Sequence, residues 1–301
     1  MKKHLIILAV ASSVFFLGCA DLKHVNNFSN TAVKTIESYN DIGYTFTSSY
    51  YNYTMAQNAY NLSGDIDNNA LRIPTPLTIP NEPATANKAD MAITFYITSI
   101  ASYFEALTQL SDKDLVNYNF DVVRDNIKAD QALKNKLGIT SDDKVDAAAR
   151  IATVFTNKLM GAYREKKIRQ VMIDYDTDVS KSIQTLIDIL NNSILPSIDA
   201  DNGLVDTKYL KVLSNRKVEL SKKAELTNSY NHEKIKLDKY KTQVLQLVKA
   251  LTAIKDEHNK TVVLLKDNKL TTKAVIDLIN QHGAEVYQLY INIKSLTTNF
   301  N

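Results

Sequence analysis

The chain has 301 residues, of which 45% are hydrophobic and 23% are charged, and its net charge is +3. This composition excludes a disordered chain and is typical of a globular protein. The first eighteen residues contribute two lysines and no acid, so the remainder carries +1 and gives no electrostatic argument for binding nucleic acid. Helix breakers are scarce, with seven Gly and five Pro, and we therefore expect an all-α fold.

Residues 1–18 have the pattern of a secretory signal peptide. Two lysines begin it, an apolar run extends from Leu5 to Leu17, and the small residue Gly18 ends it. The run is shorter than the roughly 20 residues that a membrane-spanning helix needs. We therefore expect residues 1–18 to be removed as a signal.

The four residues Phe16-Leu17-Gly18-Cys19 resemble the lipobox of bacterial lipoproteins. The resemblance implies cleavage before Cys19, diacylglycerol on its sulfur and acylation, as with palmitate, of the new amino group. It also implies attachment to the cell envelope. Inner-membrane lipoproteins have Asp after the cysteine, so Ala20 favours the outer membrane, on its periplasmic face or its surface. Three acyl chains hold a protein stably on a bilayer. The alternative is a secreted protein in which this cysteine is incidental.

Residues 19–28 are expected to form a tether, and residues 29–140 an N-terminal helical lobe. Residues 29–62 predict one helix, because their aromatic side chains recur at spacings close to three and four. We interpret this stripe as a core seam, and the alternative is a platform for a ligand or a partner. The stripe consists of Tyr39, Phe46, Tyr50, Tyr53 and Tyr60.

Residues 64–88 contain four of the five prolines and predict an extended loop, because proline lacks the backbone N–H and disfavours helix. Either Thr85 or Asn87 is expected to cap the helix that follows. Residues 89–110 form the most apolar segment after the signal. Their length suits a membrane span, but Glu105 and several other polar residues are costly in hydrocarbon. We therefore predict a buried central helix there.

The segment that follows predicts one or two shorter helices, the second of which ends at Gly138. Ser141 or Asp142 is expected to begin the next helix. Residues 141–301 are then expected to form a long antiparallel helical hairpin and a C-terminal helix, so that the chain makes one elongated helical bundle.

Residues 144–195 lack proline and predict the first helix of the hairpin. Pro196 and the polar segment 199–203 predict its turn, and residues 207–265 predict its second helix. The second helix repeats the coiled-coil spacing of three and four at Leu237, Tyr240, Val244, Leu247, Leu251 and Ile254.

The seam register continues to His258 and Thr261, where polar residues are expected to weaken it. A last helix, expected over residues 272–296, carries His282 on its apolar side. A buried metal site or pH-sensitive pair formed by His258 and His282 is one interpretation. A hydrogen-bonded histidine at the rim of the core is the favoured one for each.

No motif of a known catalytic class is present: the sequence lacks HExxH, GxSxG, the phosphate-binding P-loop and GxGxxG. With Cys19 lipidated, the mature chain has no thiol for catalysis, disulfides or metal binding. Asp174, Asp176 and Asp178 lack the Gly and Glu of a calcium loop and would point in different directions on a helix. We therefore predict a protein that is not an enzyme and has no catalytic residues, metal or cofactor.

The predicted function is that of a lipid-anchored scaffold, structural or for protein interaction, with an unidentified protein partner in the cell envelope. A second hypothesis is a binding module for a small apolar or peptide ligand, in a Tyr-rich helical pocket. A third is a membrane-active protein in which residues 89–110 insert into a bilayer. The residues of the possible ligand or partner surface are Tyr50, Tyr53, Tyr60, Phe95, Tyr103 and Phe104.

Overall fold

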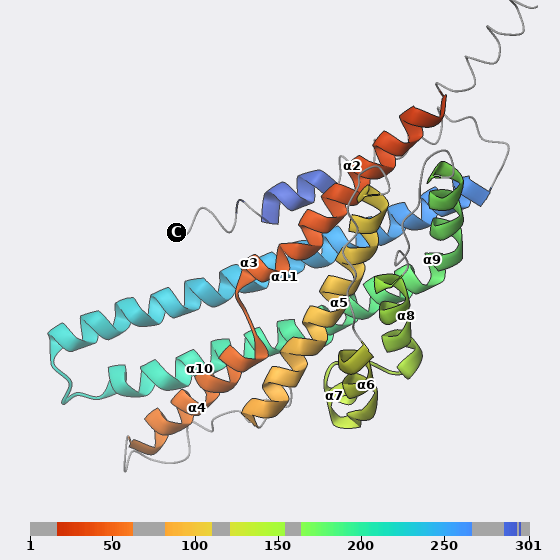
Figure 1. The fold of residues 1–301 in the computed structure, drawn as a ribbon. Helices are drawn as coiled ribbons and strands as arrows, with labels where there is room; N and C mark the ends of the chain where they lie inside the picture. Colours follow the sequence, from red (N-terminus) through yellow and green to blue (C-terminus); the bar gives the residue numbers. More distant parts are fainter. Residues whose placement is uncertain are drawn as a thin grey trace, which may run out of the picture.

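The computed structural model describes residues 17–62, 82–109, 121–153, 164–266, 286–293 and 295. Within these ranges the secondary structure is helical and contains no strand, which confirms the all-α class. Figure 1 shows an elongated bundle around a long helical hairpin. The labelled elements are α2 (Leu17–Glu37), α3 (Tyr39–Ile42), α4 (Phe46–Leu62), α5 (Pro83–Gln109), α6 (Asp121–Ala129), α7 (Gln131–Lys136), α8 (Asp142–Ala152), α9 (Arg164–Ile189), η2 (Leu190–Ile194), α10 (Leu195–Ser214) and α11 (Leu220–Lys266).

The range 19–28, expected as a tether, is helical and lies within α2. Phe28, Ala32 and Ile36 follow one another at intervals of four and are all buried, so they form one apolar face. This face packs against α5, where the ring of Phe28 meets that of Phe104 edge-on at a centroid distance of 5.7 Å. The range expected as a tether is thus part of a helix, and its last residue, Phe28, belongs to the buried face.

The single helix expected over 29–62 is interrupted at Gly43. This glycine has a φ of 71°, in the left-handed region that costs least without a Cβ atom. Helix α4 then begins under the carboxylate of Asp90 on α5, which accepts hydrogen bonds from the backbone N–H groups of Phe46 (2.7 Å) and Thr47 (3.0 Å). The break allows α4 to pack against both α5 and α10.

Helix α5 begins at Pro83, inside the range expected as a loop. Proline is favoured at the first helical position, where its missing N–H would have no partner in the helix. Thr85 and Asn87 therefore lie inside the first turns of α5 and do not cap it. Residues 63–81, the greater part of the predicted loop, lie outside the described residues.

The prediction of a buried central helix is confirmed in α5, which packs against α2, α4, α8 and α9. Its side chains include Ile93, Tyr96, Ile100 and Tyr103, all with no exposed surface. In the described part of the chain, no helix combines the length and the hydropathy that crossing a bilayer requires.

Two short helices, α6 and α7, follow α5, as predicted. Gly138 adopts a φ of 67° after the end of α7, and the N–H of Ile139 donates to the carbonyl of Lys134 at 2.8 Å. This is the left-handed helix end that glycine favours. Helix α8 begins directly after Ser141, which also agrees with the prediction.

The prediction of one uninterrupted helix over 144–195 was wrong. Helix α8 ends at Ala152, and α9 runs antiparallel to it. The direction follows from two ion pairs, since Arg150 contacts Asp178 at 2.7 Å and Lys144 contacts Asp188 at 3.3 Å. The chain therefore reverses between α8 and α9, and residues 154–163 lie outside the described residues.

The prediction of a turn at Pro196 and 199–203 was also wrong. Helix α9 continues through the π-helical turn η2 into α10, with Pro196 in the first turn of α10. A π-helical turn shifts the backbone hydrogen-bond register, and local adjustments of this kind let a helix accommodate proline. The chain reverses instead at 215–219, where the side chain of Asn215 accepts a hydrogen bond from the N–H of Lys217 at 2.9 Å.

A buried carboxylate explains why the polar segment 199–203 stays helical. Asp201 has 1% of its surface exposed and accepts hydrogen bonds from three side chains of the N-terminal part of the chain. The donors are Tyr44 (3.2 Å), Ser49 (2.8 Å) and Asn52 (3.3 Å). These contacts bind α4 to α10, more than 140 residues away in the sequence.

Beyond the turn, α11 runs back along α10, η2 and α9 for 47 residues, or about 70 Å at 1.5 Å per residue (Figure 1). The predicted seam is confirmed, because all its members are buried except Tyr240, which is partly buried. The seam does not weaken at His258 and Thr261, which are 0% and 2% exposed. Of the expected C-terminal helix, residues 286–293 are described as helical; His282 lies outside the described residues.

Candidate functional site

Cys19, the predicted lipid-attachment residue, lies in the first turn of α2. The first buried side chain described in α2 is Phe28, nine positions further along the chain. Nine helical residues span about 14 Å, whereas an extended tether of that length would reach about 30 Å. A lipid on Cys19 would therefore hold the bundle close to a bilayer.

The aromatic residues of the predicted ligand surface lie in two separate places. Phe95, Tyr103 and Phe104 are buried in the main core around α5. Tyr50 and Tyr53 pack at the small contact between α4 and α10 that Ala56 and Leu204 form. The side chain of Tyr60 lies outside the described residues. Phe95, Tyr103 and Phe104 are thus core residues, Tyr50 and Tyr53 are partly buried, and the five do not line one common pocket; of them, Phe95 lines a hollow of about 290 Å³ beside α5.

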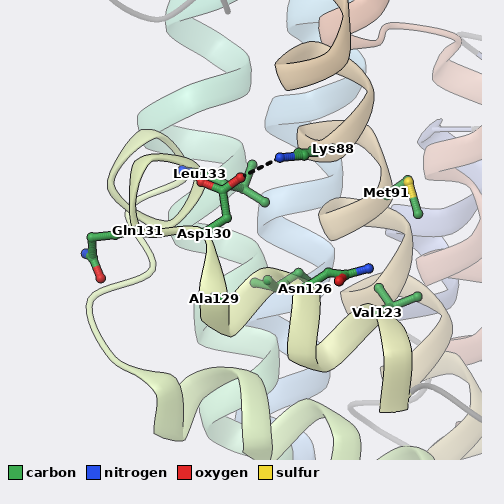
Figure 2. Close-up of a pocket in the computed structure, with 9 residues that line it drawn as sticks. Lys88, Met91, Val123, Asn126, Ala129, Asp130, Gln131 and Leu133 are labelled. Carbon is green, nitrogen blue, oxygen red and sulfur yellow. Dashed lines mark hydrogen bonds and ion pairs between the residues drawn. The ribbon is translucent and has the colours of Figure 1, made fainter.

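A cavity of about 460 Å³ opens instead where α5 faces α6 and α7. Figure 2 shows Lys88 and Met91 of α5 on one side and Val123 and Asn126 of α6 on the other. Its size is that of pockets that accept small organic molecules. A second hollow, of about 290 Å³, shares Met91 and Val123 with it. The sequence offered no signal for this site, because its walls come from segments that are 30 to 45 residues apart.

Asp130 places a negatively charged carboxylate, held by two hydrogen bonds, at the edge of this cavity. Its carboxylate accepts from the N–H of Leu133 at the start of α7 and from Lys88 Nζ, each at 2.9 Å (Figure 2). These two hydrogen bonds, the backbone one first, lower the pKa of Asp130 below its usual value. Lys88 remains more than half exposed and is the one cation among the described residues that line the cavity.

A polar cluster lies inside the core, centred on His258. The hydroxyl of Tyr103 lies 2.8 Å from Nε2 of His258. On the other side of the ring, Nδ1 lies 3.3 Å from Oδ1 of Asp176, an ion-pair contact without hydrogen-bond alignment. Lys266 contacts the second oxygen of Asp176 at 3.5 Å. The cluster therefore joins α5, α9 and α11, and the predicted position of His258 at the rim of the core was wrong.

Burial determines the protonation state of Tyr103 in this cluster. Burial, with the charge of Asp176 as a smaller cause, raises the pKa of Tyr103 well above its usual value, so its hydroxyl keeps its proton. A protonated Tyr103 can donate to Nε2 when the ring proton of His258 lies on Nδ1, the nitrogen that faces Asp176. Burial opposes ionisation of Asp176, but His258 and Lys266 outweigh it and lower the pKa of Asp176.

The three aspartates that resemble part of a calcium loop point to different partners, as predicted. Asp174 accepts from Gln170, Asp176 faces His258, and Asp178 binds Arg150 through two hydrogen bonds of 2.7 Å. No group of three or more potential metal-ligating side chains comes together among the residues that the structure describes.

The end of the hairpin is a further exposed part of the described chain. We define the hairpin tip as residues 208–225, which close the turn between α10 and α11. It carries six Lys or Arg residues and two Glu, and its Leu220 is 85% exposed. Elsewhere on the described α11, the exposed large apolar side chains are Ile235, Leu245 and Val263, which are too far apart to form a continuous stripe. The sequence shows that residues 208–225 are rich in Lys and Arg. It does not show that they lie at the end of the helical hairpin.

Comparison of the chain with protein-family models, with curated proteins and with solved structures finds no match.

Proposed function

We propose that the chain is a lipid-anchored protein of the bacterial cell envelope that acts as a non-catalytic scaffold. The observation that carries the proposal is the lipobox-like sequence ending at Cys19, directly at the start of the helix that joins the bundle. The long hairpin supports the scaffold role, because α11 extends along the bundle for about 70 Å. A partner in the envelope would then meet a rigid helical surface at a set position relative to the bilayer.

The test of the anchor is Cys19→Ser in the native host, with Ala20→Ser as the matched control. We expect the unchanged chain and A20S to incorporate labelled palmitate and to stay with the membrane fraction after a high-salt wash. C19S is expected to lose the label and to move to the soluble fraction or to be found as the uncleaved precursor. Mature C19S that withstands the salt wash would contradict the proposal, because the acyl chains supply the salt-resistant attachment.

A second candidate function, ligand binding, is favoured by the cavity of about 460 Å³ between α5, α6 and α7. The dye 1-anilinonaphthalene-8-sulfonate suits a test, because it combines aromatic rings with an anionic group that Lys88 would attract. We expect the dye to bind and Asn126→Trp, which fills the cavity, to weaken binding by about tenfold.

The control for this variant is Val122→Trp, at a position that is 73% exposed and does not line the cavity. Both variants add the same ring to the same short helix. Equal binding by N126W, V122W and the unchanged chain would show that the dye binds elsewhere and would remove the support for this second function.

A further inference from the structure

The charge of this protein is distributed unevenly. Residues 19–301 carry a net charge of +1, whereas the hairpin tip, residues 208–225, carries +4. The rest of that range therefore carries −3. A near-neutral chain in which one end concentrates the positive charge attracts anionic surfaces at that end and repels them elsewhere.

Three cations of the tip are available to solvent. Arg216 and Lys217 are exposed at the turn, and Lys222 is exposed on the first turn of α11. Lys222 contacts Glu225 at 2.7 Å, but both side chains are more than half exposed, so the pair contributes little and leaves the charge accessible. Two apolar side chains of the tip are exposed as well, Leu220 at 85% and Leu210 at 47%, so the basic surface also contains apolar area.

Two acidic residues next to the tip, Asp206 and Glu233, are hydrogen-bonded between α10 and α11. Glu233 accepts from Tyr209 (2.6 Å) and Lys208 (2.8 Å), and Asp206 accepts from Tyr230 and Lys234 (2.9 Å each). These contacts hold α10 and α11 together behind the tip. They also direct the carboxylates of Asp206 and Glu233 toward the hairpin seam, so the outer end presents mainly cations.

We propose that the hairpin tip binds an anionic phospholipid surface. Each Lys or Arg near such a surface is attracted by roughly 1 kcal/mol, and an exposed leucine adds apolar contact at the headgroup boundary. A bilayer requires no shape complementarity, which suits flexible lysine and arginine side chains beside the exposed Leu220 and Leu210. An acidic protein groove would demand a more structured surface than this turn offers.

The tip and the start of α2 lie at opposite ends of the long dimension of the bundle (Figure 1). If Cys19 is lipidated, which rests on the proposed function, the chain has two separate membrane contacts, one acyl and one electrostatic. Membrane binding by the tip itself does not depend on the lipid, so the two claims are tested separately.

The experiment uses residues 19–301 with Cys19→Ser, which retain all of the described chain except Leu17 and Gly18. Flotation is measured with vesicles of phosphatidylglycerol and phosphatidylethanolamine and with vesicles of phosphatidylcholine alone. We expect binding to the first kind only, falling as salt rises. The quadruple variant R216Q/K217Q/K222Q/K223Q is expected to lower the partition coefficient by at least about tenfold, and Leu220→Ser by about threefold.

The matched control is K236Q/K239Q/K249Q/K260Q, which removes the same amount of charge from α11, away from the tip. It is expected to change the partition coefficient less than about twofold, and circular dichroism checks that both variants fold. No flotation with the anionic vesicles, or equal losses in the two quadruple variants, would overturn the proposal. Binding to soluble dextran sulfate without binding to vesicles would overturn it in favour of an anionic polymer.

Discussion

Replacement of His258 by Ala is expected to lower the free energy of unfolding by about 3–5 kcal/mol. His258 has no exposed surface and lies edge-on to the rings of Tyr103 and Phe104, at centroid distances of 5.5 Å and 6.1 Å. The substitution opens a cavity between α5 and α11. It also leaves the hydroxyl of Tyr103 without its hydrogen-bond partner and Asp176 without the nearer of the two side chains that contact it, and unpaired buried polar groups are costly.

Chemical denaturation followed by far-UV circular dichroism measures this effect. His232→Ala is the control, because His232 is exposed on the same helix, and its replacement is expected to change stability by less than about 0.5 kcal/mol. Tyr103→Phe removes only the hydroxyl and is expected to cost about 1–2 kcal/mol. If H258A cost no more than H232A, the buried cluster would not contribute to stability.

The second large effect concerns Asp201 and pH. Burial, opposed by the hydrogen bonds from Ser49, Asn52 and Tyr44, raises the pKa of Asp201 from 3.8 to about 6. Between these two pH values the unfolded chain has lost the proton and the folded chain has kept it. The folded state then binds more protons, so stability falls as pH rises through this window and levels off above it. The loss is about 3 kcal/mol, since one pKa unit corresponds to roughly 1.4 kcal/mol.

The matched pair of variants is Asp201→Asn and Asp199→Asn. The amide that D201N introduces cannot ionise, so this variant is expected to lose the pH dependence while it keeps an oxygen that accepts hydrogen bonds. Asp199 is more than half exposed and pairs with Lys241 on the surface, and D199N is expected to retain the dependence. The quantity to compare is the stability difference between each variant and the unchanged chain over the window from 3.8 to about 6.

This comparison also separates Asp201 from the other carboxylates. Hydrogen bonds and positive neighbours lower the pKa values of Asp130, Asp142 and Asp176, so their contribution to stability is lost only as pH falls below about 4. That loss occurs equally in D201N and in the unchanged chain. A stability difference between the two that does not vary with pH would contradict the assignment to Asp201.

Local apolar patterning was enough to predict the central helix and the seam of the long helix α11. The spacing of three and four from Leu237 to Ile254 specifies one buried face whatever the rest of the chain does. The helix end at Gly138 could also be predicted, because a left-handed helix end depends on only a few consecutive residues.

The errors occurred where distant residues decide the local structure. The segment around Asp201 has the composition of a turn, yet it is helical because Tyr44, Ser49 and Asn52 satisfy its buried carboxylate. His258 looked like the weakening end of a seam, yet it is buried because Tyr103 and Asp176, 155 and 82 positions away, supply its polar contacts.

By itself, the sequence determined that the chain is helical, where its longest apolar faces lie, and that Cys19 stands in a lipobox-like motif, since each of these is set by residues near one another in the chain. Only the tertiary structure decided where the hairpin turns, which polar groups are buried, and that a cavity opens between α5, α6 and α7. The physical reason is that burial and hydrogen bonding of a polar side chain depend on partners that folding brings from far along the chain.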